Sequence, residues 1–443
     1  MDAGTPHTQA PAASEGREVA GLTDHLFRQE SGKMVSVLTG IFGLERLQLA
    51  EDVVQEALVR ALKTWPFYGV PQNPAAWLMQ TAKNLALDYL RREKNFREKQ
   101  PRIIVDIEQR LSAGEHRDEP FFEDEIKDQR LRLIFACCHP LVPQDAQTAL
   151  ALKTLCGLSP AEIASAFLSS EAAIAKRLTR ARQRIQEQKI PFEIPSGADL
   201  PPRLDGVLQI VYLLFNEGYK ASSGDSLIRE ELCGEAIRLG VLLTEHPAAR
   251  LPRTHALLAL MLLDAARLPA RTDGDGLLLR LQDQDRSKWN RGLIFRGIQQ
   301  LGLAADGAEL SGYHLQAGIA ACHCLAPDFA STDWPTILSH YDQWQRLDDS
   351  PVVALNRAVA LAQVHGPQAG KDAVAAMPYR AQLEGYYLLY AVLGEFEARL
   401  GKPAAAAAYF RQALDLTESA SERTFLTWRM RQCAAPAPVP VKS

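Results

Sequence analysis

Apolar side chains recur every three to four residues along most of the chain, which is the spacing of amphipathic helices. The strict alternation typical of half-buried strands is scarce. The pattern predicts three or four helices between about residues 22 and 97, a compact helical unit from 128 to about 189, and a long run of Ala- and Leu-rich helices from 204 to 430. The predicted fold class is therefore all-α.

Two helices of the first group can be placed in detail. The stretch "LQLAEDVVQEALVRALKTW" predicts an inner face of Leu49, Val53, Ala57, Leu58 and Leu62, and an outer face of Glu51, Asp52, Gln55 and Glu56. A second helix begins at "NPAAWLMQ", with Asn73 as N-cap and Pro74 in the first helical position. The intervening "WPFYGVPQ" reads as a short aromatic loop.

Breaks in periodicity and composition set the domain boundaries. Residues 98–127 are rich in acidic residues and interrupted by proline and glycine, which favours a flexible linker. Four prolines in "IPFEIPSGADLPPR" mark another boundary. We expect a flexible tail (1–20), two helical domains (21–97 and 128–190) joined by the acidic linker (98–127), a second linker (191–203), a helical extension (204–430) and a flexible tail (431–443).

The end of the extension carries a repeat signal. In "YAVLGEFEARLGKPAAAAAYFRQALDL", Gly394, Gly401, Ala406, Phe410 and Ala413 have the spacing of a tetratricopeptide unit. A fainter copy places Gly366 35 residues before Gly401, and the final proline of the pattern is replaced by Glu418. These signals predict stacked helix pairs without establishing a solenoid.

Composition narrows the classes of function. The formal net charge of −4 gives no global attraction to nucleic acid, so such binding requires local patches. The seven cysteines form no Cys-x-x-Cys pair, which favours buried thiols over a disulfide framework or a metal site. We expect no metal, cofactor, signal peptide or membrane span, and a cytoplasmic location. The charged stretch "DQDRSKWNR" lacks any catalytic pairing, so we predict a helix start laced with salt bridges and no enzyme.

The stretch "GLSPAEIASAFLSSEAAIAKRLTRARQRI" has a local positive charge. Ser159 and Glu162 have capping-box spacing, and Ser169 or Ser170 caps a second helix. Ile174, Leu178 and Ala181 face inward and leave the cations outside, as in a helix-turn-helix. An ordinary helical hairpin with a solvated basic face explains the same pattern, and Leu168 stands where the turn commonly has glycine.

A second cationic helix, after Asn73, follows the aromatic Phe67 and Tyr68. Rings beside cations suit unstacked bases and their phosphates. Alternatively, the aromatics are core and the cations stabilise the helix C-terminus.

Together, "AEDVVQEALVRALKTW", "NPAAWLMQTAKNLALDYLRRE" and the basic stretch resemble regions 2 and 4 of extracytoplasmic-function sigma factors of bacterial RNA polymerase. The resemblance covers about residues 22–188. It implies that Asp52, Gln55 and Glu56 bind the clamp helices of the polymerase's largest subunit, with further contact to the flap. It assigns the melted −10 element to Phe67, Tyr68, Asn73, Lys83, Asn84, Arg91 and Arg92. It assigns the −35 duplex to Ser170, Glu171, Ala173, Lys176, Arg177 and Arg180.

The C-terminal half, including "LDGVLQIVYLLFNEGYKASSGD", is similar to the helical extension of one subgroup of these factors. That similarity implies control of activity by the extension itself, with a protein or peptide as its partner. Two alternatives stay open. One is a tetratricopeptide-like adaptor that binds polymerase without initiating, and the other is a helix-turn-helix repressor that binds duplex DNA without polymerase.

Overall fold

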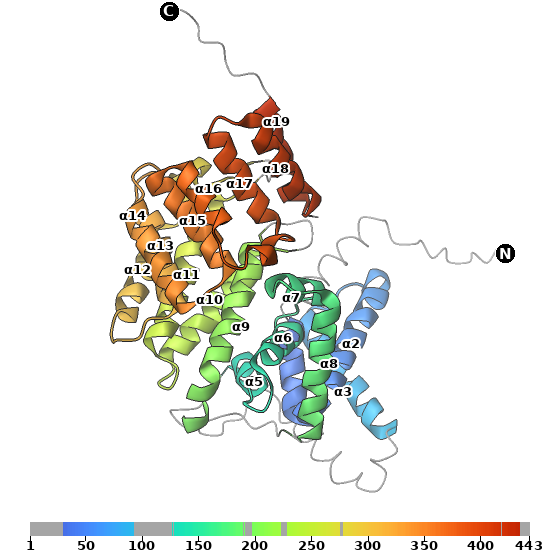
Figure 1. The fold of residues 1–443 in the computed structure, drawn as a ribbon. Coiled ribbons are helices and arrows are strands. Elements are labelled where there is room, and N and C mark those ends of the chain that lie inside the picture. The colour runs from blue at the N-terminus through green and yellow to red at the C-terminus, as the bar shows by residue number, and fades with distance from the viewer. Residues whose placement is uncertain are drawn as a thin grey trace, which may run out of the picture. The chain divides into compact units, whose positions relative to one another are not determined.

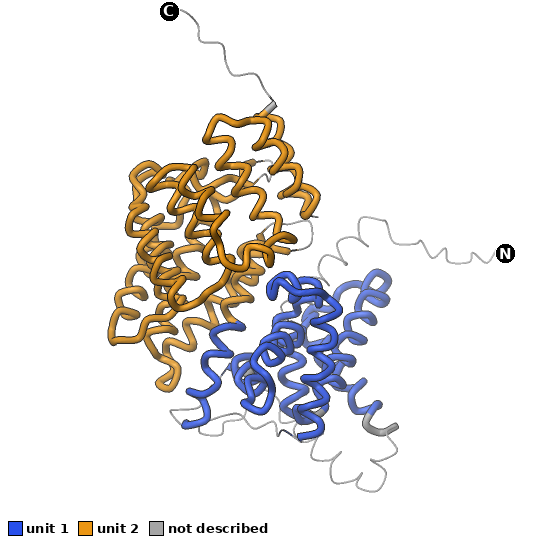
Figure 2. The backbone as a smooth tube through the Cα atoms, in the orientation of Figure 1, with its two compact units in different colours: residues 1–210 blue, residues 211–443 orange. Residues whose placement is uncertain are grey.

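A computed structural model describes residues 30–92, 126, 128–188, 190, 197–222, 228–274, 278–417 and 419–434. In these ranges every regular element is helical, apart from one isolated bridge between Thr272 and Leu278 (Figure 1). The all-α prediction is confirmed. The chain forms two compact units, residues 1–210 and 211–443 (Figure 2). The predicted N-terminal tail and nearly all of the acidic linker lie outside the described residues.

Unit 1 begins with helical residues 30–42, η1 (Leu44–Arg46), α2 (Leu47–Tyr68) and α3 (Pro74–Arg92). Two predicted positions on α2 are wrong, because Leu62 is 44% exposed and Glu51 only 8% exposed. At about 100° per residue, Leu62 lies about 40° beyond Leu58, outside the buried arc of the helix. Glu51 lies only about 20° from Leu58, at the edge of that arc.

The predicted aromatic loop is shorter than expected. Trp65 is buried and packs edge-on against Trp77, with ring centroids 5.6 Å apart, so its burial holds the last turn of α2 in place. The helix ends at Gly69, whose φ of +82° favours glycine and whose N–H donates to the Trp65 carbonyl at 2.9 Å. The N-cap prediction is confirmed, since Asn73 Oδ1 accepts from the Ala76 N–H at 3.0 Å.

The second half of unit 1 holds α5 (Gln129–Cys137), α6 (Gln144–Thr154), α7 (Pro160–Ala166) and α8 (Glu171–Glu187). The capping box of Ser159 and Glu162 is confirmed, and Ser170 rather than Ser169 caps α8. Ile174, Leu178 and Ala181 are buried, as the helix-turn-helix pattern predicts. Leu168 takes the left-handed conformation, φ +48°, that glycine commonly supplies in this turn.

The boundary between the two units falls inside α9 (Pro201–Tyr219), which follows η3 (Gly197–Asp199). The first half of α9 packs within unit 1. Arg203 donates to the Phe135 carbonyl at 3.2 Å, and a Cβ on Gly206 would stand 3.1 Å from Cys138 Sγ. Unit 1 therefore includes the start of the predicted extension.

In unit 2, successive helices pack mainly on their neighbours in the chain. The elements are α10 (Glu230–Glu245), α11 (Pro252–Ala265), η4 (Leu268–Ala270), η5 (Leu281–Asp283), η6 (Arg286–Lys288), α12 (Arg291–Ala304), α13 (Gly312–Leu325), α14 (Trp334–Leu347), α15 (Pro351–His365), α16 (Pro367–Ala375), η7 (Arg380–Leu383), α17 (Tyr387–Arg399), α18 (Pro403–Asp415) and α19 (Ala420–Ala434). The last helix therefore continues four residues past the expected boundary at 430.

The predicted repeat is a pair of packed helices, α17 and α18. Gly394 lies against the Phe410 ring, and the turn at Gly401 has a φ of +72°. Ala406, Phe410 and Ala413 are buried in one cluster. Gly366, with a φ of +90°, makes the equivalent turn between α15 and α16. Stacked helix pairs are thus confirmed.

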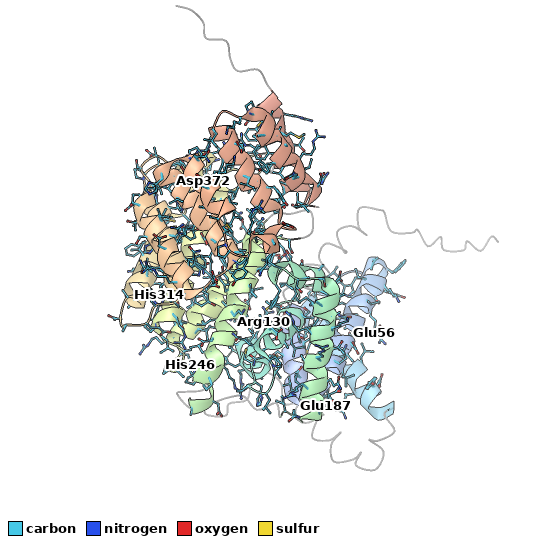
Figure 3. The ribbon with its side chains drawn as sticks, viewed as in Figure 1. Glu56, Arg130, Glu187, His246, His314 and Asp372 are labelled. Carbon is cyan, nitrogen blue, oxygen red and sulfur yellow. The ribbon has the colours of Figure 1, made fainter. Side chains whose placement is uncertain are left out.

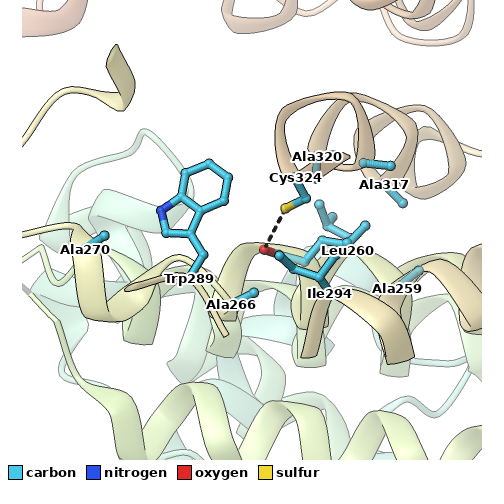
Figure 4. Packing of buried hydrophobic residues seen from close by; sticks show 11 residues of the cluster. Ala259, Leu260, Ala266, Ala270, Trp289, Ile294, Ala317, Ala320 and Cys324 are labelled. Carbon is cyan, nitrogen blue, oxygen red and sulfur yellow. Dashed lines mark hydrogen bonds between the residues drawn. The ribbon is translucent and has the colours of Figure 1, made fainter. Parts of the chain in front are cut away.

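A second cluster in unit 2 surrounds α11 and α13 (Figure 4). The Cys324 thiol donates to the Leu263 carbonyl at 3.5 Å, and Trp289 is buried beside Arg286. Asn290 caps α12, so the predicted helix start at "DQDRSKWNR" is confirmed. The predicted salt bridges are only partly right, because buried Arg286 donates to the carbonyls of His323 and Ala326 instead of a carboxylate.

Candidate functional site

The outer face of α2 combines carboxylates with apolar side chains. Asp52, Gln55 and Glu56 are exposed, as predicted (Figure 3 labels Glu56). Asp52 accepts from Gln48 Nε2 at 2.7 Å, and Glu56 pairs with Arg60 at 3.2 Å. The same face carries Val59, which is 40% exposed, and Leu62, which is 44% exposed and lies at the edge of the face beside the buried arc. Sequence reasoning missed these two, although their spacing from Gln55 by four and seven residues is helical.

The C-terminal end of α2 displays two large aromatic rings. Phe67 is 68% exposed and Tyr68 is 86% exposed, whereas Trp65, in the same turn, is buried. A hydrophobic ring this exposed gains nothing from the core, so these two side chains are available to stack on a partner.

On α3 the predicted −10 residues differ in their surroundings. Asn73 uses its side chain to cap the helix, and exposed Asn84 accepts from Gln80 Nε2 at 3.0 Å. Lys83 is half-buried. Arg91 and Arg92 end the helix, and their side chains lie outside the described residues.

On α8 the exposed face is opposite the buried Ile174, Leu178 and Ala181. It carries the predicted Glu171, Lys176 and Arg180, together with Ala175, Thr179 and Gln183, which the prediction omitted. The omitted positions follow from the same three-to-four-residue spacing, so the periodicity could have identified them. Ser170 is exposed but uses its hydroxyl to accept from the Ala173 N–H at 3.2 Å, and Ala173 itself is half-buried.

Three arginines of α8 bond to the protein. Arg177 pairs with Asp145 of α6 at 3.0 Å and lies 5.2 Å from the centre of the Phe167 ring. Arg182 bonds to Glu51, and Arg184 donates to the Leu141 carbonyl at 3.2 Å. The exposed cations Lys176 and Arg180 are therefore better placed than Arg177 to meet DNA.

The part of the chain that the structure describes holds no cluster of three or more potential metal-ligating side chains. Five of the seven cysteines are buried thiols, and Cys322 and Cys433 are half-buried. Burial and the nearby Arg267 and Arg286 lower the pKa of His323 to about 3, so this histidine stays neutral. None of the described helices has the length and apolar character needed to cross a membrane.

Comparison with known proteins matches the two halves of unit 1 to separate family models. Residues 26–96 match sigma-70 region 2 and residues 132–185 match sigma-70 region 4. The chain is 30% identical over 143 residues to the ECF RNA polymerase sigma-E factor of Haemophilus influenzae, covering 75% of that protein and 32% of this chain. The chain belongs to the extracytoplasmic-function sigma factors. It is an alternative sigma factor, with core RNA polymerase and promoter DNA as partners, and it directs the initiation of transcription.

Further comparisons cover the first part of the chain again and reach into unit 2. The ECF RNA polymerase sigma-E factor of Escherichia coli K12 is 27% identical over 141 residues, which is 74% of its length and 32% of this chain. An uncharacterized protein of Rhizobium meliloti is 40% identical over 392 residues, covering 88% of this chain and 91% of that protein. Residues 203–305 match a family of unknown function (DUF6596). No solved structure gives a significant match.

Proposed function

We propose that the outer face of α2 is the docking surface for the polymerase clamp helices. Asp52, Gln55 and Glu56 supply negative charge and hydrogen bonds, and Val59 and Leu62 supply apolar area beside them. Apolar area together with polar side chains is the usual composition of a protein interface. The carboxylates direct the approach of a basic partner, because complementary charge mainly raises the association rate.

The melted −10 element is captured at the end of α2 and along α3. Phe67 and Tyr68 stack on unpaired bases, while Asn84 and Lys83 face the base edge and backbone, and Arg91 and Arg92 hold the adjacent phosphates. Stacking on an aromatic ring contributes about 1–3 kcal/mol per base, which is enough to offset part of the cost of unstacking. The exposure of Phe67 and Tyr68 beside buried Trp65 is the observation that carries this proposal.

The −35 element is read by α8 from the major groove. Lys176 and Arg180 meet phosphates or bases, and Ser170 and Glu171 bring the N-terminus of the helix to the base edges. Ala173 and Ala175 allow close approach, and a contact by Arg177 requires its pair with Asp145 to break. The factor catalyses no reaction of its own, because the polymerase makes the RNA. The factor acts in the cytoplasm, where polymerase and DNA are found.

The helical extension controls this activity. Its first helix, α9, begins in unit 1 against Phe135 and Cys138 and ends in unit 2, so the start of the extension is part of the DNA-binding unit. Stacked helix pairs commonly present an extended surface to a protein or peptide, which is the class of partner that we propose for it.

Transcription in vitro tests the proposal. With core polymerase and promoters selected from a random library, the full chain should produce transcripts from one −35/−10 pair. The double variant F67A/Y68A should still bind core polymerase but open the promoter at least about tenfold less well. Variant E245Q, which changes an exposed carboxylate at the end of α10 in unit 2, serves as the control. Polymerase binding with no transcript from any promoter would indicate an adaptor, and a specific footprint without polymerase would indicate a repressor.

A further inference from the structure

Helix α12 presents an apolar face to solvent at the outer edge of unit 2 (Figure 1). Phe295 is 64% exposed and Leu303 is 49% exposed. Gln299 is exposed midway between them, four residues from each. Residues four apart lie on the same side of a helix, so these three side chains form one surface, which we call the α12 face.

Packing on the opposite side fixes the orientation of α12. The buried side consists of Ile294, Gly297 and Ala304. Gly297 lies so close to α11 that a Cβ would stand 2.7 Å from Leu263 Cγ. Because a rotation of the helix would break this close packing, the α12 face stays on the outside of unit 2. Large apolar side chains gathered on one exposed face are typical of a contact with another protein.

The charges at the two ends of the α12 face have opposite signs. Arg291 and Arg296 are exposed in the first half of the helix, and Asp306 is exposed two residues past its end. At about 100° per residue, Arg291 lies about 40° from Phe295 and therefore borders the face. Arg291 and Asp306 each stand at the end of the helix where the helix dipole disfavours their charge, so the stability of the helix does not explain them.

The α12 face is complementary to itself when one copy is reversed. With Gln299 at the centre, Phe295 of one copy lies opposite Leu303 of the other, because each is four residues from the centre. Arg291 and Asp306 of opposite copies likewise come together, since they are eight and seven residues from Gln299. A partner of one uniform charge would match only one end of this face, whereas a second copy matches both.

We propose that the α12 face is a homodimer interface, in which α12 of one copy packs antiparallel on α12 of a second copy. Gln299 then lies on the two-fold axis, where the two side-chain amides can donate to and accept from each other. The helix has 14 residues and is about 21 Å long, so the interface is small. We therefore expect a dissociation constant on the order of 1–100 µM.

Sedimentation equilibrium of the full chain from about 1 to 200 µM tests the dimer. The mean mass of the wild type should rise with concentration from 48.9 kDa toward twice that value. F295S and L303S should each raise the dissociation constant at least about tenfold, because each substitution removes two apolar contacts per dimer. L416S is the matched control, since this leucine is 41% exposed at the end of α18 and should leave the constant unchanged.

Charge reversal tests the antiparallel arrangement. R291D and D306R should each raise the dissociation constant about threefold or more, and the double variant R291D/D306R should restore it because the opposite charges exchange places. Both substitutions agree with the helix dipole, so weaker association cannot come from a less stable helix.

Each outcome of these measurements bears on the proposal. A mass of 48.9 kDa at every concentration would overturn the dimer. Equal constants for F295S and L416S would show that copies associate through another surface, and no recovery in R291D/D306R would overturn the antiparallel arrangement. Neither polymerase nor DNA is present, so failure here would leave the proposed function in initiation untouched.

Discussion

The arginines of α8 differ in their bonding partners although they lie on one helix. Arg182 and Arg184 bond to Glu51 and to the Leu141 carbonyl, and Arg177 pairs with Asp145. Lys176 and Arg180 point to solvent from the same helix. The number of cations on α8 therefore overstates the charge available to DNA, and Lys176 and Arg180 are the better candidates because their side chains are exposed among the described residues.

Removing either exposed cation should weaken DNA binding in a salt-dependent way. For K176A or R180A, the slope of log affinity against log salt should fall by about 0.9, because each phosphate contact releases about one counterion. The slope is measured for polymerase loaded with the factor on a promoter fragment. R184A is the control, since this arginine bonds to a carbonyl of its own unit. Equal loss of slope in all three variants would show that exposure does not select the contacts.

His323 should make the stability of unit 2 sensitive to acid. Its pKa is lowered to about 3, whereas an unfolded histidine titrates near 6.5, so the unfolded state binds more protons between these values. The free energy of unfolding should therefore fall as the pH drops from about 6.5 toward 3, by up to about 1.4 kcal/mol per unit from this group. H323F should flatten the curve measured by denaturant titration. Some slope should remain, because burial lowers the pKa of His340 as well.

At the scale of elements, sequence rules succeed where the cause is local. The caps at Asn73, Ser159 and Ser170 depend on a side chain and a backbone N–H three residues away. The spacing predicted Asn73 and Ser159, and it left Ser170 as one of two candidates. The burial of Glu51 and Trp65 depends on contacts with residues of other helices. Periodicity indicates which arc of a helix is buried, but it does not indicate where that arc or the helix ends. Glu51 was misplaced near the edge of the buried arc of α2, and Trp65 was misplaced in a loop although it lies in the last turn of the helix.

The packing of α17 on α18 gives an element-scale prediction. A Cβ on Gly394 would lie 2.7 Å from the Phe410 ring, so G394V should destabilise unit 2 by about 1–3 kcal/mol through overpacking. Thermal melting of the full chain gives the change. G234A in α10 is the control, because a Cβ there meets nothing within 4 Å and alanine favours a helix by about 0.5–1 kcal/mol. If G394V melts with the wild type, the two helices do not pack through this glycine.

At the scale of the whole molecule, the sequence predicts the order of the helical regions but not the limits of the compact units. Prolines between 191 and 202 indicated a boundary there, whereas the compact unit continues to residue 210. Composition marks where a helix cannot continue, and it carries no information about which neighbour the next helix packs on. The roles of the site residues likewise came from resemblance to a family, since exposure and charge show only which side chains are available.

The position of α9 determines how the control by the extension must be tested. A chain ending at residue 190 loses the bond from Arg203 to the Phe135 carbonyl and the close packing of Gly206. The free energy of unfolding of this shorter chain should therefore be about 2 kcal/mol lower than that of a chain ending at 210, which keeps both contacts. A change in transcription by the chain ending at 190 would therefore not distinguish a destabilised region 4 from the loss of regulation by unit 2. We expect the 1–210 form to bind core polymerase. Its transcript yield should differ from that of the full chain by at least about threefold, which corresponds to a free-energy difference of about 0.6 kcal/mol. Identical yields from these two forms would mean that unit 2 does not regulate initiation.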